Sequence, residues 1–148
     1  MKSLLSALLL LSFSAFASET VIEPSIVACD KETLRNYVKP DNRSTVTMPK
    51  NIKIEPREIG FGDPAIWSLL HVIKVEFPVA LKTKKACFLI DKAYLNSVKS
   101  VGHDAKSGRL LEMSVSVATG DADGNIGSKD IKLKVRVNQA SGKLSIEK

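Results

Sequence analysis

The side chains that most often carry catalysis are scarce in this chain, which contains two histidines, His71 and His103. His71 lies in an apolar run that favours a core position, and His103 lies in a turn-like segment that favours solvent. The His, Cys and acidic residues show no zinc-ligand spacing, and the sequence contains no nucleophile elbow, P-loop or dinucleotide fingerprint. We therefore predict no catalytic residues, and an enzyme whose site is assembled from scattered residues is an alternative.

One loop carries three carboxylates around Gly124: Asp121, Asp123 and Asp130. Thr119–Asp130 resembles an EF-hand calcium loop in its third and fifth ligand positions, Asp121 and Asp123, in the sharp-turn glycine and in the apolar Ile126. Thr119 stands where that loop begins with Asp, and Asp130 replaces its long bidentate Glu. The flanking residues alternate as strands do, so the sequence favours a hairpin loop in which Asp and Gly supply turn conformations. We predict no cofactor, with calcium at the three Asp residues as the alternative.

A second chemical pattern is the row Lys132, Lys134 and Arg136, which alternates with apolar residues. On a strand these charges stand about 7 Å apart, a spacing that can follow phosphates or sulfates. Aromatic residues do not interleave with them, so nucleic acid is not an expected partner. Outward charges also protect strands from edge-to-edge pairing. A solvated face is therefore the ordinary interpretation, and an anion-binding face is the functional one.

The chain begins with a segment that predicts export. Lys2 precedes the apolar run Leu4–Phe16, and small residues flank a cleavage position after Ala17. The run is too short to cross a bilayer and no later stretch is long enough, so we expect no transmembrane anchor. The predicted organisation is a signal peptide at 1–17 and one disulfide-closed, β-rich domain at 18–148. The product is periplasmic or secreted.

The two cysteines, Cys29 and Cys87, are expected to pair because an exported chain folds in an oxidising compartment. Cys87 lies in Ala86–Ile90, which is apolar at every position. Such a segment is apolar on both faces, as a central, fully covered strand would be. We therefore expect Cys87 inside the domain, where the bond ties the N-terminal segment to the core.

The strongest structural pattern is a long β-hairpin over Gly108–Asn138. Apolar residues recur at every second position of each arm, which places them on one side of the strands. They are Leu111, Met113, Val115 and Val117 on the first arm, and Ile131, Leu133, Val135 and Val137 on the second. Pairing Val117 with Ile131 keeps both apolar rows together and sets Glu112 opposite Arg136. Only shifts by an even number of residues preserve this arrangement.

Several shorter segments are less clear in type. Helical spacing after Asp30 predicts a short helix reaching Val38, and Asp91 could cap a short helix through Val101, although a strand is also compatible there. Residues 65–71 fit a helix and a strand equally, whereas 72–77 favour a strand. The predicted fold is mainly antiparallel β, sandwich-like or an open barrel, with one or two short helices. The alternative is α+β.

The expected function follows from export, charge and the absence of a catalytic motif. With 22 basic and 16 acidic side chains, the net charge is +6, which favours encounters with anionic surfaces. We expect a non-catalytic binding or interaction module whose partner is an anionic polymer, an envelope surface or another protein. An inhibitor of a secreted enzyme is the first alternative, and an enzyme is the second.

The covalent prediction can be tested on the exported protein. Its intact mass should correspond to a chain that starts at Ser18 and should increase on reduction by the hydrogens of two thiols. Labelling of the native protein by a thiol reagent would contradict a bond between Cys29 and Cys87.

Overall fold

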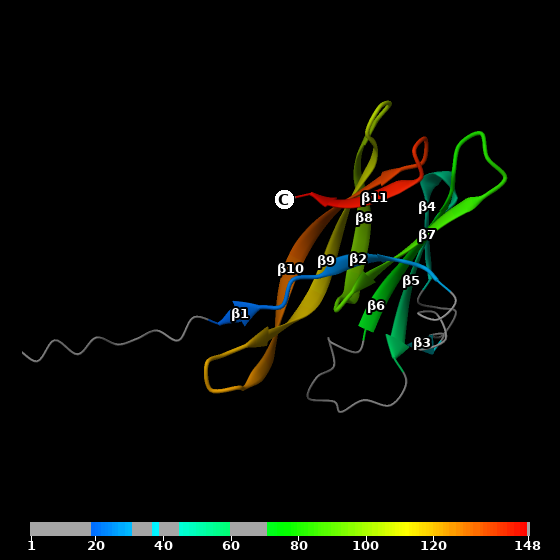
Figure 1. The fold of residues 1–148 in the computed structure, drawn as a ribbon. Helices are drawn as coiled ribbons and strands as arrows, with labels where there is room; N and C mark the ends of the chain where they lie inside the picture. The colour runs from blue at the N-terminus through cyan, green and yellow to red at the C-terminus, as the bar shows by residue number, and fades with distance from the viewer. Residues whose placement is uncertain (1–18, 31–36, 39–44, 60–70, 148) are drawn as a thin grey trace, which may run out of the picture.

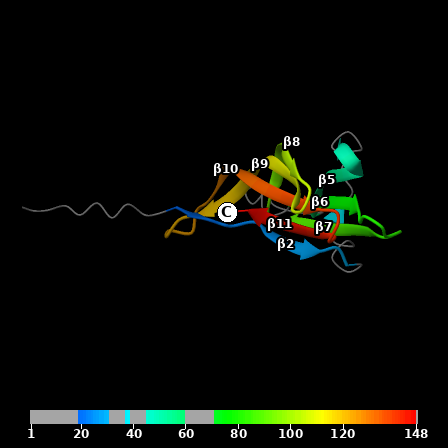
Figure 2. The same cartoon turned by 90° about the horizontal axis from the view of Figure 1, so that it is seen from above.

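The structure is a computed structural model that describes residues 19–30, 37–38, 45–59 and 71–147. Within these ranges most residues belong to one of two antiparallel sheets (Figures 1 and 2). The predicted signal peptide at 1–17 and nearly all of the ambiguous segment 65–71 lie outside the described residues.

The first sheet, called the hairpin sheet here, has the order β1-β9-β10-β11, with β8 paired to β9 beside β1. Its strands are β1 (Thr20–Val21), β8 (Tyr94–Asp104), β9 (Gly108–Gly120), β10 (Ile126–Asn138) and β11 (Lys143–Glu147). The second, called the disulfide sheet, has the order β2-β7-β6-β5-β3, with β4 also paired to β5. Its strands are β2 (Ser25–Ala28), β3 (Tyr37–Val38), β4 (Val46–Met48), β5 (Ile52–Ile59), β6 (His71–Pro78) and β7 (Lys85–Asp91).

The predicted hairpin is present, with both outer ends at the predicted residues: β9 begins at Gly108 and β10 ends at Asn138. The predicted register is wrong by two residues, because Ile131 lies opposite Val115 and not Val117. The error leaves every side chain on its predicted face, as an even shift must. Its cause is the tight loop Asp121–Asn125, where the Asp121 N–H donates to the Asn125 carbonyl at 3.1 Å.

The core lies between the two sheets. The alternate apolar residues of β9 and β10 face those of β5, β6 and β7, and most are fully buried. The central members are Leu111, Met113, Val115, Val117 and Val135 from the hairpin sheet, and Ile54, Ile73, Val75, Phe77 and Ile90 from the disulfide sheet. In the described part of the chain no ladder joins the two sheets. The prediction of a mainly antiparallel, sandwich-like β fold is confirmed.

The helix considered between Asp91 and Val101 is not formed, because β8 runs as a strand along β9. Its register shifts between Leu95 and Ser97, and again between Ser100 and Gly102. A bulge adds one residue to a strand, so Leu95 and Val98 both pack against the core although they are three residues apart. That spacing is what made the segment look helical.

One other local prediction also needs correction. Tyr37 and Val38, assigned to a helix after Asp30, pair with β5 as β3; residues 31–36 lie outside the described ranges. Strand β5 contains a proline, Pro56, and continues through it. On its outer side β5 pairs with β4 up to Ile54 and with β3 from Glu58. The proline lies between these two ladders, where no strand of the described residues requires the N–H that proline lacks. The helical element of the described residues is the 3₁₀ turn Pro49–Asn51.

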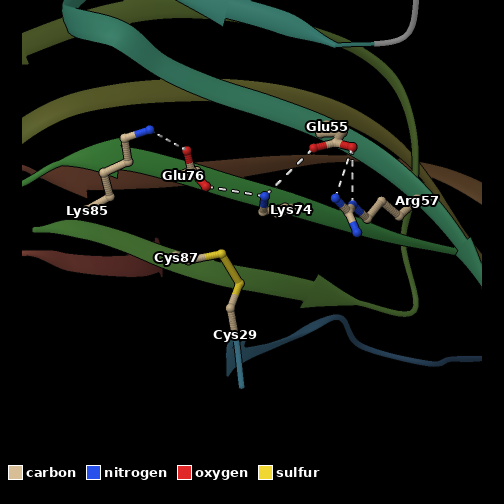
Figure 3. A network of polar contacts seen from close by, with 7 residues as sticks. All are labelled: Cys29, Glu55, Arg57, Lys74, Glu76, Lys85 and Cys87. Atoms are coloured by element: carbon tan, nitrogen blue, oxygen red, sulfur yellow. Dashed lines mark hydrogen bonds and ion pairs between the residues drawn. A yellow bond between two sulfur atoms is a disulfide. The ribbon is translucent and has the colours of Figure 1, made fainter. Parts of the chain in front are cut away.

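The predicted disulfide is present and joins Cys29, just after β2, to Cys87 on β7 (Figure 3). Cys87 was expected inside, but it is half-buried and lies opposite Glu76 on the outward face of the disulfide sheet. The strand is internal, between β2 and β6, yet this face carries charges instead of a second core. The bond closes a loop with a sequence separation of 58 residues, which stabilises the folded state by about 4 kcal/mol on the chain-entropy model.

Gly108 at the start of β9 provides a sharp test of the fold. Its φ is +89°, and an added Cβ would lie 2.2 Å from the Val137 carbonyl oxygen. Gly108→Ala should therefore cost more than about 2 kcal/mol of unfolding free energy, measured by urea denaturation. The control Gly102→Ala, whose Cβ would have no neighbour within 4 Å, should stay within about 0.5 kcal/mol of wild type. Equal losses for both variants would contradict the described pairing of β9 and β10.

Candidate anion-binding face

The predicted row Lys132, Lys134 and Arg136 projects from the outward face of β10, since the intervening residues Leu133 and Val135 are buried. Across the β9 ladder the three basic residues lie opposite Ser114, Glu112 and Leu110 respectively. The structure therefore brings the row together on one side of the hairpin sheet, at the spacing of alternate strand positions.

Arg136 is the member of the row that is already engaged. Its guanidinium donates to the Glu147 carboxylate on β11 and to the Ser107 hydroxyl, the latter at 2.9 Å. The hydrogen bond from Arg136 lowers the pKa of Glu147, and the same bond raises the pKa of Arg136. Arg136 therefore joins β10 to β11 and to the turn before β9, and it is poorly placed to bind a ligand.

Lys132 and Lys134 differ from Arg136, because both are exposed and neither forms an ion pair with any residue that the structure describes. Lys134 has a carboxylate residue opposite it on each side, Glu112 on β9 and Glu147 on β11. These two acids are paired instead with Lys99 and Arg136. Two ammonium groups are thus left facing solvent on one strand.

A shallow depression of about 390 Å³ lies beside Lys132, across β8, β9 and β10. Its lining is Ser97, Val98, Lys99, Glu112, Ser114 and Lys132. Two hydroxyls and two ammonium groups at its edge can donate to the oxygens of a phosphate, sulfate or carboxylate. Its volume suits one charged sugar or phosphate group more than a large ligand.

Glu112 opposes anion binding in this depression. Its carboxylate accepts from Lys99 at 2.9 Å, and this hydrogen bond, ahead of the charges of Lys132 and Lys134, lowers its pKa. Glu112 is therefore ionised at neutral pH and partly neutralises the three lysines. The net local charge stays positive, because three ammonium groups surround one carboxylate.

The structure does not bring the three proposed calcium ligands together. The Asp121 carboxylate accepts from the backbone N–H groups of Asp123 and Asn125, both at 2.9 Å, and from the Asn125 side chain. The hydrogen bond from the Asn125 side chain is the largest cause of the lowered pKa of Asp121. Asp130 lies on β10 and accepts from Ser116 at 2.5 Å and from Asn96. Among the described residues no three His, Cys, Asp or Glu side chains form a cluster suited to a metal ion.

The two histidines lie on different sheets. His71 begins β6, is 5% exposed and meets the Tyr94 ring edge-on at a centroid distance of 4.8 Å. His103 is exposed near the end of β8, opposite Arg109. The structure therefore does not gather them into a common site, and their expected positions, core and solvent, are those observed.

The outward face of the disulfide sheet carries a second charged cluster, in which the charges are mutually paired (Figure 3). A chain of contacts runs from Arg57 through Glu55, Lys74 and Glu76 to Lys85, with N···O distances of 3.2, 3.9, 3.2 and 3.3 Å. These ion pairs link β5, β6 and β7 across their ladders. The cluster stabilises the sheet and has little capacity left for a ligand.

Sequence reasoning missed Lys99 and the depression beside it. Lys99 lies opposite Glu112 only because β8 is a strand with a bulge after Leu95. The signal was present in the sequence as apolar residues three positions apart between polar ones, a pattern that a helix and a bulged strand share.

Comparison of the chain with protein-family models, curated proteins and solved structures gives no match. Among the described residues no helix is long and apolar enough to cross a membrane. The disulfide is a feature typical of proteins outside the cytoplasm.

Glu76 gives a pH-dependent test of the paired cluster. Partial burial raises its pKa, but the hydrogen bond and charge of Lys74, then those of Lys85, outweigh this and hold the pKa below the ordinary 4.5. Ionised Glu76 therefore stabilises the fold fully when the pH is above its pKa in the unfolded chain. This stabilisation is lost as the pH falls through the lower pKa that Glu76 has in the folded protein. Glu76→Gln should be less stable than wild type at pH 7, and the difference should vanish in acid.

The measurement is the unfolding free energy of both proteins from urea titrations between neutral pH and acid. Glu58→Gln, an exposed position on β5, is the control and should follow wild type at every pH. A Glu76→Gln variant with an unchanged pH profile would show that the ion pairs of Figure 3 do not contribute to stability.

Proposed function

We propose that this protein is an exported, non-catalytic binding module that holds an anionic envelope polymer on the outward face of the hairpin sheet. The predicted signal peptide at 1–17 accounts for export, and the Cys29–Cys87 bond suits an oxidising compartment. The ligand class is a polymer that carries phosphate, sulfate or carboxylate groups at repeated positions.

The observation that carries this proposal is the state of Lys132 and Lys134. Both are exposed and without an ion-pair partner in the described part of the chain, whereas Lys99 and Arg136 on the same face are paired. Two unpaired lysines about 7 Å apart match the repeat of a charged polymer better than a single small anion. The hydroxyls of Ser97 and Ser114 in the adjoining depression add neutral donors.

Binding of this kind is electrostatic and weak at each contact, so it should depend steeply on salt. Heparin is a suitable probe because it is a soluble polyanion that carries both sulfate and carboxylate groups. Lys132→Gln/Lys134→Gln should elute from a heparin column at lower salt than wild type. The plot of log affinity against log salt has a negative slope, and the magnitude of this slope should decrease by about two, one for each lost contact.

A matched control removes the same two charges elsewhere. Lys92 lies in the turn before β8, and the exposed Lys129 lies on β10 opposite Val117, away from the depression. Lys92→Gln/Lys129→Gln should retain most of the wild-type salt slope. Equal losses in the two double variants would show that only net charge matters, and this would contradict a specific binding face.

Glu112→Gln tests the same site in the opposite direction. Removing the carboxylate should raise the salt concentration needed for elution, because it frees Lys99 and removes the negative charge of Glu112 from beside Lys132 and Lys134. Glu58→Gln on the other sheet is the charge-matched control and should have a smaller effect. Weaker heparin binding by Glu112→Gln would contradict the proposed position of the ligand.

A further inference from the structure

Four turns of the chain meet at one end of the sandwich, and two neighbouring side chains connect them. The Gln139 side-chain amide donates to the carbonyls of Lys50 and Pro78, both at 3.1 Å. The Gln139 carbonyl accepts from the Ala80 N–H at 2.9 Å. Asn138 donates to the carbonyl of Lys106 at 3.1 Å. The turns β4–β5, β6–β7, β8–β9 and β10–β11 therefore form one surface, at the upper end in Figure 1.

This surface, called the basic end here, gathers lysines that are distant in sequence. All of them are exposed and come from the joined turns or the strand residues next to them: Lys50, Lys53, Lys82, Lys84, Lys85, Lys106 and Lys143. Two acids of the described residues lie beside these lysines. Glu76 is paired with Lys74 and Lys85, and Asp104 accepts from the N–H groups of Lys106 and Ser107. Most of the positive charge is thus uncompensated.

The tip of the β6–β7 turn adds an apolar side chain to this charge. Leu81 is fully exposed, at 107% of its reference area, and its φ of +62° is a left-handed conformation that non-glycine residues rarely adopt. The turn is closed by hydrogen bonds from Lys82 N–H to the Val79 carbonyl and from Val79 N–H to the Lys84 carbonyl, both at 3.2 Å. A leucine is therefore held away from the protein in a turn that also carries Lys82 and Lys84.

We infer that the basic end docks on an anionic lipid bilayer, with Leu81 inserted between headgroups and the surrounding lysines against them. A soluble polyanion would satisfy the lysines but would gain nothing from an exposed leucine. A bilayer satisfies both, because an apolar side chain can enter the acyl boundary while ammonium groups remain at the headgroups. The surface uses other residues than the polymer-binding face, so the two inferences stand independently.

The chemistry predicts a peripheral and reversible contact. Each lysine near an anionic surface strengthens binding by about fivefold, and one inserted leucine strengthens it by about tenfold or more. Because the connections through Asn138 and Gln139 fix the turns relative to one another, the lysines reach the bilayer together without further ordering of the backbone.

Co-sedimentation with vesicles tests this inference. The full protein should bind vesicles of equal parts phosphatidylglycerol and phosphatidylcholine, bind phosphatidylcholine vesicles far more weakly, and dissociate as salt is raised. Lys82→Gln/Lys84→Gln should bind the anionic vesicles about thirtyfold more weakly. Leu81→Asn should bind them about tenfold more weakly, and its fold should be kept because Asn tolerates the left-handed conformation.

The matched control is Lys132→Gln/Lys134→Gln, which loses two charges from the other surface and should stay within about threefold of wild type on vesicles. Heparin elution of Leu81→Asn should be unchanged. The inference would be overturned if the wild-type protein bound neutral and anionic vesicles equally. It would also be overturned if Leu81→Asn bound anionic vesicles as wild type does while its urea midpoint is normal. If Lys132→Gln/Lys134→Gln elutes from heparin at the same salt as wild type, the polymer-binding proposal is contradicted and the bilayer inference is not.

Discussion

The burial of one side of the β9–β10 hairpin is the constraint on which the rest of the structure depends. Leu111, Met113, Val115 and Val135 are inaccessible to solvent, and each alternates with a residue that must then face outward. The hairpin also provides the ladder edges for β1, β8 and β11. The same alternation that forms the core therefore decides where Lys132 and Lys134 project.

The hairpin was predictable because its apolar pattern is local and periodic. Its register was not predictable, because a shift by an even number of residues keeps every side chain on the same face. The loop hydrogen bonds of Asp121 choose between the two registers. Strand β8 could not be distinguished from a helix in the sequence, because a bulge places its core-facing residues three positions apart. Gln139, which joins residues 50, 78 and 80, could not be recognised either, since nothing in the sequence marks a contact between turns so far apart.

Three groups of charges in the described part of the chain differ in how they are paired. On the outward face of the disulfide sheet the charges pair with one another across three strands, as Figure 3 shows. On the hairpin sheet Lys99 and Arg136 are paired while Lys132 and Lys134 are not. At the basic end the lysines around Leu81 are largely uncompensated. In the described residues, lysines without an ion-pair partner thus gather on two surfaces with distinct chemistry, one on the outward face of the hairpin sheet and the other around the exposed Leu81.

The most direct test of the polymer-binding face is an NMR titration of the isotope-labelled protein with a short sulfated oligosaccharide. Amide signals around Ser114, Lys132 and Lys134 should shift together, saturably and at lower oligosaccharide concentration than those of Lys50 and Lys84. Shifts concentrated at the basic end, or none on β9 and β10, would contradict the account. A short oligosaccharide is essential, because a long chain would reach both surfaces at once.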